Sequence, residues 1–362
     1  MPLLLAAVAL FLPVMLPAQA VPRTDTPPAG RLRFTFEPVI TTWEREFTGS
    51  GHEQPIGASL PARVFVHEER RVTPFVFEFG ITNRIAVGVS IPLVRVNTRA
   101  TFPLDSTGTQ APDSAARALD SLLQDTTYAF GPIANTTRRL LFFAGDVELQ
   151  AKYRLLETHA YALSGALVVR LPTGHQDSPN DLFDLATGDH QTDIELQAAQ
   201  ELTLFDHLWL NAMVRLGRQQ PGTRAKRVGP QSTLLIRHAA LTTLNWDPGD
   251  YAAVDVAPML RLAKHFGVGF TVGYWTQQRD RYAYRSAQDS IDLATHLGAP
   301  VAASVLDVGT GIRRTRLGVA MTYLGSDVEG SFSIEQTVSA AGGLVPVATA
   351  FRIVMRTSRW PF

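Results

Sequence analysis

The sequence predicts an all-β protein, an antiparallel up-and-down transmembrane β-barrel of about 12 strands with short periplasmic turns and long external loops. Three observations lead to this prediction. Apolar and polar residues alternate with a period of two through most of the chain. The alternating stretches run for about ten residues or more, the length with which a tilted strand crosses a bilayer. Short and long connections follow one another without exception.

The alternation is clearest in the stretch 145–155. From Val147 to Leu155 its odd positions are all apolar, and all its even positions are charged or polar, as expected of a strand with two different faces. Eleven further stretches follow the same rule, which gives twelve expected strands. They cover 31–41, 73–81, 84–96, 145–155, 160–171, 192–204, 208–217, 251–263, 266–277, 304–314, 316–324 and about 347–360.

The connections between these strands alternate in length. Five are short turns, at 82–83, 157–159, 206–207, 264–265 and 314–315. Six are long, at 48–61, 98–141, 172–191, 218–250, 280–303 and 325–346. Strict alternation places all the short turns at one end of the sheet and all the long loops at the other, which is the layout of an outer-membrane barrel.

A soluble secreted β-sandwich also alternates, and it is the main rival fold. Strand length favours the membrane, because strands of soluble proteins average about 5–6 residues. Only 18% of the residues are charged, against ~25% in an average soluble domain. This low value is the average of an apolar face for lipid and a charged face for the interior. The chain also ends in Phe362, a terminal residue typical of bacterial outer-membrane proteins.

The expected organisation has three parts: a signal peptide at 1–20, a flexible periplasmic leader at 21–30 and the barrel at 31–362. The apolar run from Leu3 to Leu12 is too short for a spanning helix, and Ala18-Gln19-Ala20 fits a cleavage site. The long external loop 98–141 contains a helical pattern at Asp113–Gln124. That helix could enter the lumen as a plug or lie as an amphipathic helix on the outer loops.

In a barrel the apolar face meets lipid, so the charged face must line the interior. Two interpretations of this interior stay open: ion pairs that neutralise one another in a narrow lumen, or a polar conduit whose charge rings set selectivity. The candidate lumen-facing residues are Asp146, Glu148, Lys152, Arg154, Arg170, Asp193, Glu195, Glu201, Arg215, Asp255, Arg261, Arg313 and Arg352.

One segment resembles a known family. Residues 145–154, Gly-Asp-Val-Glu-Leu-Gln-Ala-Lys-Tyr-Arg, precede a strand that ends Leu171-Pro172-Thr173-Gly174. This pattern resembles the outer-membrane barrel family named for the meta-cleavage pathway of phenol degradation. The resemblance is good over about 140–220 and weaker elsewhere. It implies an outer-membrane transporter or channel.

Other functions find little support. The absence of cysteine excludes disulfides, Cys-ligated zinc and a thiol nucleophile, and a net charge of zero gives no footprint for nucleic acid. The acidic loop 175–193 matches no calcium motif, so a solvated loop is favoured there. A barrel-embedded lipid hydrolase would need a His–Ser pair on the lipid side, and the histidines fall at turns or loops.

The sequence thus predicts an exported outer-membrane protein of a Gram-negative bacterium that passes small solutes, hydrophobic or aromatic ones among them. The alternatives are a closed structural barrel and, less favoured, the lipid-modifying enzyme. The expected partners are outer-membrane lipid and lipopolysaccharide, a small-molecule solute and the barrel-assembly machinery. We expect no catalytic residue, metal or cofactor.

Overall fold

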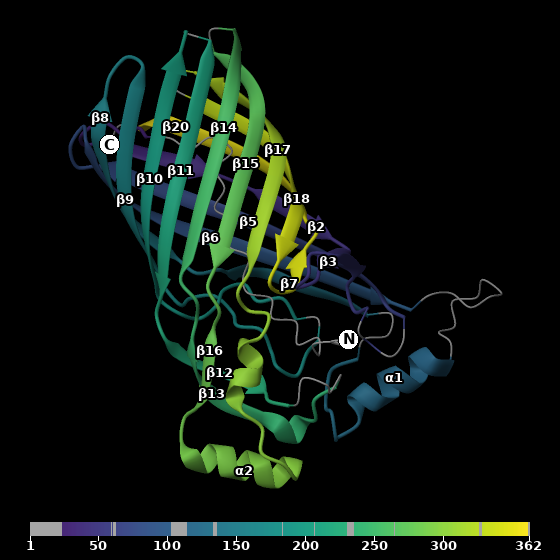
Figure 1. Ribbon diagram of the computed structural model, residues 1–362. Coiled ribbons are helices and arrows are strands. Elements are labelled where there is room, and N and C mark those ends of the chain that lie inside the picture. Colours follow the sequence, from purple (N-terminus) through teal and green to yellow (C-terminus); the bar gives the residue numbers. More distant parts are fainter. Residues whose placement is uncertain are drawn as a thin grey trace, which may run out of the picture.

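The computed structural model describes residues 24–58, 60, 63–102, 114–132, 136–182, 184–205, 207–229, 235–263, 265–325 and 328–360. The expected signal peptide and Phe362 lie outside these ranges. One large antiparallel sheet dominates the fold (Figure 1). Its strands are β1 (Leu32–Phe36), β2 (Val39–Trp43), β5 (Phe65–Gly80), β6 (Ile85–Thr101), β7 (Thr136–Ala144), β8 (Glu148–Glu157), β9 (Tyr161–Arg170), β10 (Asp193–Leu204), β11 (Leu208–Gln219), β14 (Tyr251–Ala263), β15 (Phe266–Gln277), β17 (Arg313–Leu324), β18 (Val328–Ala341) and β20 (Thr349–Trp360).

The sheet closes on itself. Its 14 strands occupy twelve positions, because β1 continues into β2 and β7 continues into β8. Neighbours in the sheet are also neighbours in sequence, and the last strand, β20, pairs with both β1 and β2 to complete the ring. Closure pairs neighbouring strands all the way round the ring, which removes unpaired backbone groups that lipid could not satisfy. Among the described residues β7 is paired on one side only, with β6. The predicted twelve-strand up-and-down barrel is therefore confirmed.

Prolines explain why two of the twelve positions are split. Pro74 of β5 faces Pro92 of β6, and neither can donate a backbone hydrogen bond to a neighbouring strand. On one side the chain breaks between β1 and β2, where the backbone N–H of Glu37 donates to the Pro74 carbonyl over 3.3 Å. On the other side it breaks between β7 and β8, where Gly145 donates to the Pro92 carbonyl over 2.7 Å. Both breaks therefore lie at the level of this proline pair.

One expected strand is wrong, and two strands of the large sheet were missed, β18 and β7, of which β7 lies largely in the predicted loop 98–141. The segment predicted as strand 304–314 begins in the 3₁₀ helix η2 (Ala303–Asp307), whose Ala303 and Leu306 are buried in a loop core, and it reaches β17 only at Arg313. The turn predicted at 314–315 does not exist, because β17 runs through that position with a bulge. The next short turn lies after Leu324, and β18 occupies most of the predicted loop 325–346.

The long loops build a cap at the end of the barrel opposite the short turns (Figure 1). A three-stranded sheet of β12 (Gly222–Arg227), β13 (Leu241–Asp247) and β16 (Arg281–Tyr284) packs with η1 (His238–Ala240) and α2 (Ala287–Leu297). Its own apolar core includes Leu244, Trp246 and Leu293. A second small sheet pairs β3 (Arg45–Phe47) with β4 (Glu53–Pro55) and β19 (Val345–Pro346).

Helix α1 (Ser114–Gln124) belongs to the outer loops. Its Leu119 and Leu123 are buried in one apolar cluster with Val94 and Val96, which lie on the inner face of the long strand β6. In Figure 1 the helix lies beside the protruding ends of β5, β6 and β7 and not along the barrel axis. Of the two expected placements, the structure therefore shows the helix on the outer loops.

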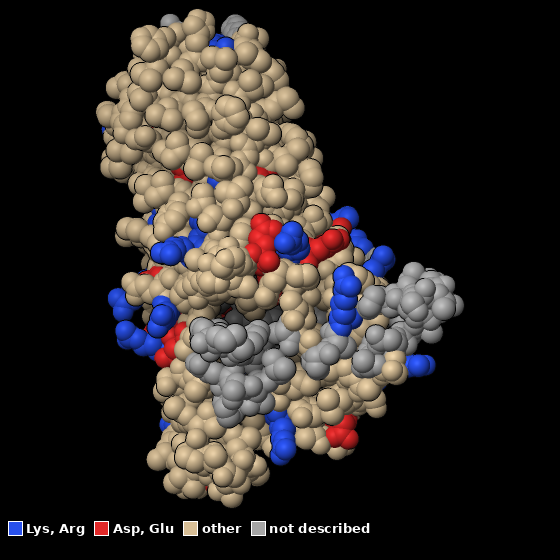
Figure 2. Space-filling model, turned by 45° about the vertical axis from the view of Figure 1, so that its right-hand side comes forward, with Lys and Arg blue, Asp and Glu red and all other residues tan. Residues whose placement is uncertain are grey.

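The outer surface of the barrel is apolar. Leucine, valine, phenylalanine and tyrosine side chains are exposed on nearly every strand, among them Leu155, Leu196, Leu216, Phe270 and Val319. Figure 2 shows a broad zone on the visible face that is almost free of charged side chains, bordered by Lys, Arg, Asp and Glu near the loops. Strands of 12 residues, such as β10 and β11, tilted by ~45°, span roughly the ~25 Å of the apolar band expected of a transmembrane barrel. No helix among the described residues is long and apolar enough to span a membrane.

An ion cluster fastens the cap to a neighbouring loop. Asp177 pairs with Arg224 and, over 3.0 Å, with Lys226, and the side chains of all three are buried. Burial alone would raise the pKa of the Asp177 carboxyl, but Lys226 and Arg224 outweigh it and lower the pKa to about 2. Arg224 also lies over the Trp246 ring, 4.7 Å from its centroid.

This cluster predicts an acid-sensitive cap. A carboxyl whose folded-state pKa is lowered stabilises the fold above its unfolded pKa, and that contribution is lost as the pH falls from about 4 to about 2. Trp246 fluorescence should therefore report loosening of the cap in this range. Asp177→Asn should loosen the cap at neutral pH and abolish the transition, whereas an unchanged acid transition in this variant would show that another group controls it.

Candidate functional site: the barrel lumen

The inward face of the barrel carries a ladder of ion pairs across neighbouring strands. Arg215 of β11 donates to Asp255 of β14 over 2.6 Å, and Arg316 of β17 reaches the other Asp255 oxygen over 2.8 Å. Arg316 also pairs with Glu335 of β18 over 3.3 Å. The ladder thus alternates in sign around the wall, so each buried charge faces an opposite one.

A second group of inward side chains lies on β8, β9, β10 and β14. Arg170 bridges Asp193 (2.6 Å) and Glu148 (3.0 Å). Glu195 accepts hydrogen bonds from the Tyr251 hydroxyl over 2.5 Å and from the Gln197 side-chain amide. Arg352 pairs with Glu37, at the break between β1 and β2, over 3.5 Å. Side chains of β8, β9, β10, β14 and β20 therefore contribute paired polar groups to the interior.

Glycines make room for these long side chains. A Cβ at Gly273 would lie 2.7 Å from both Asp255 and Arg316, so only glycine lets this pair meet across β15. Gly217 lies directly under the Tyr251 ring. That ring also stacks on Trp275 with 4.3 Å between centroids. The two glycines therefore allow side chains from strands on either side to join above them.

Gly217→Ala should displace the Tyr251 ring, because the added methyl group would overlap it. We expect a loss of about 1–3 kcal/mol, the usual cost of overpacking, with a changed near-UV circular dichroism spectrum from the Tyr251–Trp275 stack. Gly165→Ala is the matched control, since a Cβ there meets nothing closer than 3.8 Å. Equal unfolding midpoints and spectra for both variants would contradict the packing described.

A cavity of about 160 Å³ remains inside the barrel. Charged side chains, Arg33, Glu78, Lys152 and Arg215 among them, line it. Apolar side chains of β5 and β6 also line it, namely those of Val72, Pro74, Val76, Pro92 and Val94. The cavity is large enough for several water molecules, and its lining offers both polar and apolar contacts to a solute.

The loop end of the lumen is bordered by acidic groups. Asp146 is buried and accepts backbone hydrogen bonds from Gly174 (2.8 Å) and Asp189 (3.0 Å). Burial, followed by the neighbouring Asp193 and Asp146, raises the pKa of the Asp189 carboxyl to about 8. Across the cavity Arg70 reaches the Thr187 carbonyl with a long contact of 3.5 Å. Loop 171–192 is thereby fixed to the barrel wall.

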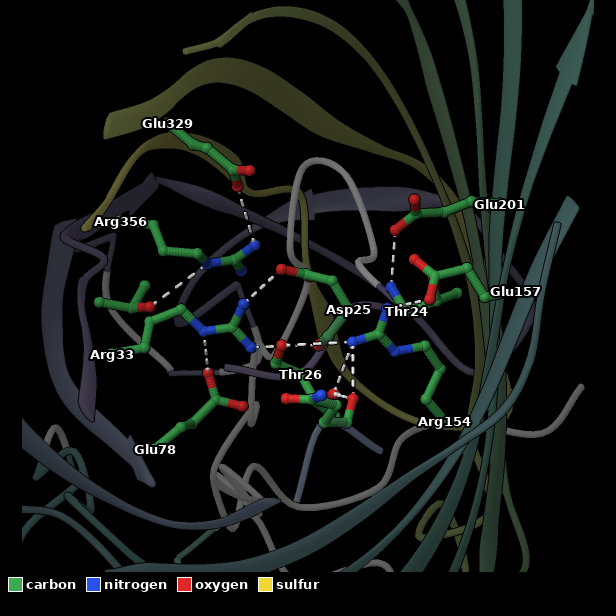
Figure 3. Close-up of polar contacts among 12 residues, drawn as sticks. Thr24, Asp25, Thr26, Arg33, Glu78, Arg154, Glu157, Glu201, Glu329 and Arg356 are labelled. Atoms are coloured by element: carbon green, nitrogen blue, oxygen red, sulfur yellow. Dashed lines mark hydrogen bonds and ion pairs between the residues drawn. The ribbon is translucent and has the colours of Figure 1, made fainter. Parts of the chain in front are cut away.

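The short-turn end of the lumen holds part of the chain itself. Residues 24–30 do not form the flexible leader expected from their prolines; Thr24 and Thr26 are buried in this mouth. Figure 3 shows them among inward side chains from several strands. Arg33 pairs with Asp25 over 2.5 Å and with Glu78 over 2.9 Å. The mouth is therefore narrowed by a segment that precedes the first strand.

The structure distributes the site residues predicted from the sequence along the length of the lumen. Glu148, Arg170, Asp193, Glu195, Arg215, Asp255 and Arg352 belong to the two groups of ion pairs. Lys152 lines the cavity, Asp146 lies at the loop end, and Arg154 and Glu201 lie at the short-turn mouth. Arg261 lies near the end of β14, with its guanidinium 5.7 Å from the Trp209 ring centroid.

Arg313 is misplaced in the sequence-based assignment. Its side chain is exposed, whereas Arg314 and Arg316 are buried on the inward face. The error follows from the false turn at 314–315, which shifted the phase of this strand by one residue. Glu335 was missed for a related reason, because β18 was assigned to a loop. The alternation of Glu329, Ser331, Ser333 and Glu335 with Phe332 and Ile334 is the signal that could have revealed it.

Among the described residues no cluster of three or more histidine, aspartate or glutamate side chains could hold a metal ion. No family model matches the chain, and no curated protein matches its sequence. The resemblance to the meta-cleavage family therefore stays a prediction.

The comparison with solved structures finds outer-membrane proteins. The crystal structure of an outer membrane channel from Pseudomonas putida F1 has a TM-score of 0.57 and 10% identity, covering 92% of this chain and 97% of that chain. The transport unit of the autotransporter AIDA-I from Escherichia coli has a TM-score of 0.43 and 6% identity, covering 98% and 95%. The similarity to the Pseudomonas putida channel shows that this chain has the fold of a known outer-membrane barrel.

Proposed function

We propose that this protein is an outer-membrane channel that passes small solutes through its lumen. The observation that carries the proposal is the contrast between the two faces of one closed sheet. The outward face is apolar, and the inward face holds charged groups and a cavity. A closed barrel with this polarity is stable in lipid and offers a path whose walls a polar solute can contact.

The residues that line the cavity suggest the chemical class of the solute. The lining combines apolar side chains of β5 and β6 with charged side chains, so a small molecule with an apolar body and a polar group would find contacts for both. The resemblance of residues 145–174 to the meta-cleavage family favours an aromatic compound. Export by the signal at 1–20, insertion by the barrel-assembly machinery and contact with lipopolysaccharide belong to the same proposal.

A closed structural barrel is the second candidate. The observation that favours it is the filled interior: ion pairs span much of the lumen, and the remaining cavity measures only about 160 Å³. Transport would then require movement at the two ends of the barrel. Flux of solute separates the two candidates, because a closed barrel passes none.

A matched pair of variants tests the proposal in liposomes. Met213 lines the cavity, whereas the next residue, Val214, is exposed on the lipid-facing side. We expect proteoliposomes with the unaltered chain to take up benzyl alcohol or benzoate faster than empty vesicles. Met213→Trp should slow this uptake severalfold by filling the lumen, and Val214→Trp should leave it unchanged. Uptake equal to that of empty vesicles with all three proteins would contradict a channel.

A further inference from the structure

The segment Thr24–Pro28 occupies the short-turn mouth of the barrel. Thr24 and Thr26 are almost fully buried, with 2% and 5% exposed, and the Asp25 side chain between them is 30% exposed, although the segment belongs to no strand. The chain then turns at Gly30, which has a φ of 71°, and enters β1 at Leu32. Residues 27 and 28 pass so close to Gly80 that a Cβ there would overlap their carbonyl groups. The segment therefore packs closely against the barrel wall at the short-turn mouth.

Side chains from separate strands hold this segment (Figure 3). Glu201 of β10 accepts a hydrogen bond from the Thr24 backbone N–H over 2.6 Å. Arg33 of β1 pairs with Asp25 over 2.5 Å. Arg154 of β8 donates to the Thr26 hydroxyl over 2.9 Å. The contacts thus come from three strand positions, so the segment lies across the mouth and is not attached to one wall.

The turn between β5 and β6 adds a further anchor. The Thr26 hydroxyl donates to the Asn83 carbonyl over 2.9 Å, and the Asn83 side chain accepts from the Ala29 backbone N–H over 3.0 Å. The named contacts of Thr24–Pro28 are polar, and none of them is part of the barrel sheet. They can therefore be exchanged for water without breaking a strand pairing.

The two arginines that hold the segment also have carboxylate partners on the barrel itself, which they keep when the segment leaves. Arg33 retains Glu78 at 2.9 Å, and Arg154 retains Glu157 at 2.5 Å. Release consequently leaves neither cation without a carboxylate, and this limits its cost. We propose that Thr24–Pro28 is a displaceable plug that closes the short-turn mouth, so that leaving the mouth opens the lumen. This inference rests on the proposed channel function.

A planar-bilayer recording of two variants tests the plug. Asp25→Ala removes the ion pair with Arg33, and the fraction of time spent open should rise roughly tenfold, the change expected from losing one charge-assisted hydrogen bond. Glu53→Ala is the control, because Glu53 forms an exposed pair with Arg45 at the opposite end of the molecule. Equal open fractions in Asp25→Ala, Glu53→Ala and the unaltered chain would overturn the plug.

A disulfide lock gives the converse result. The chain contains no cysteine, so a pair introduced at Thr26 and Asn83 would be its only thiols. Oxidised Thr26→Cys/Asn83→Cys should stay closed, and dithiothreitol should restore the openings of the unaltered chain. An oxidised double variant, with the disulfide shown by mass spectrometry, that conducts like its reduced form would contradict the proposal.

Thiol labelling separates the plug from the channel function. Thr24→Cys keeps the backbone bond to Glu201, and its buried thiol should react slowly with a polar maleimide. Adding Asp25→Ala should speed this reaction about tenfold. Fast labelling without Asp25→Ala would overturn the plug whatever the conductance. The expected labelling pattern in a barrel that never conducts would instead show a seated, releasable segment and contradict the channel.

Discussion

Leu196→Arg is expected to prevent stable assembly of the barrel, whereas Gln197→Arg folds like the unaltered chain. The two residues are adjacent in β10 and point to opposite faces. Leu196 is 57% exposed on the outer surface, and its sheet neighbours Leu167 and Leu216 are exposed beside it. An arginine in this apolar band should cost about 2–4 kcal/mol near the middle of the membrane.

Gln197 lines the cavity and contacts Glu195 over 2.6 Å. An arginine at this position would meet a carboxylate, so its charge finds a partner inside the barrel. Refolding into detergent micelles, read by heat-modifiable migration on a gel and by urea titration, compares the two variants directly. Equal folding of both would refute the assignment of the two barrel faces.

Asp255→Ala is expected to have the second largest effect. The Asp255 carboxylate pairs with Arg215 and Arg316, and both guanidinium groups are buried. Its removal leaves two cations next to each other without the charge between them. Breaking a buried pair by removing one partner costs about 3–5 kcal/mol.

Glu335→Ala is the control, for which we expect a smaller loss of stability than for Asp255→Ala. Glu335 lies at the end of the same ladder and pairs only with Arg316 there, which keeps Asp255 at 2.8 Å after the substitution. Its loss should therefore cost less than that of Asp255. The free energy of unfolding of the two variants in urea checks this order. An equal or larger loss for Glu335→Ala would show that the ladder does not share its charges as described.

The local alternation of apolar and polar residues was sufficient to predict the barrel. In the strand predicted at 145–155, the structure has β8 from Glu148 to Glu157, because a strand with one lipid face must alternate in its own sequence. The prediction failed where a loop segment alternates for another reason, or where a strand alternates only weakly. Leu306 and Val308 alternate in a loop segment because Leu306 serves the cap core. In β18 the outward face includes Gly330 and Gln336, which weakened its alternation.

Contacts between distant strands lay beyond the sequence. Alternation tells which face a side chain occupies, but the register of neighbouring strands decides which charges meet. The seating of residues 24–28 is the clearest case, since Thr26 contacts Arg154 from 128 residues away. Pro27 and Pro28 in a polar stretch suggest a leader, and nothing local in the sequence indicates that Arg33, Arg154 and Glu201 converge on it.

The central claim is that solute and ions pass through the lumen of this barrel. Single-channel recording of the purified full chain in a planar lipid bilayer tests it most directly. Discrete, reversible openings are predicted, with a conductance lowered by Met213→Trp and unaffected by Val214→Trp. Folded protein, verified by heat-modifiable migration, that inserts and produces no openings in any of these variants or in Asp25→Ala would contradict the account.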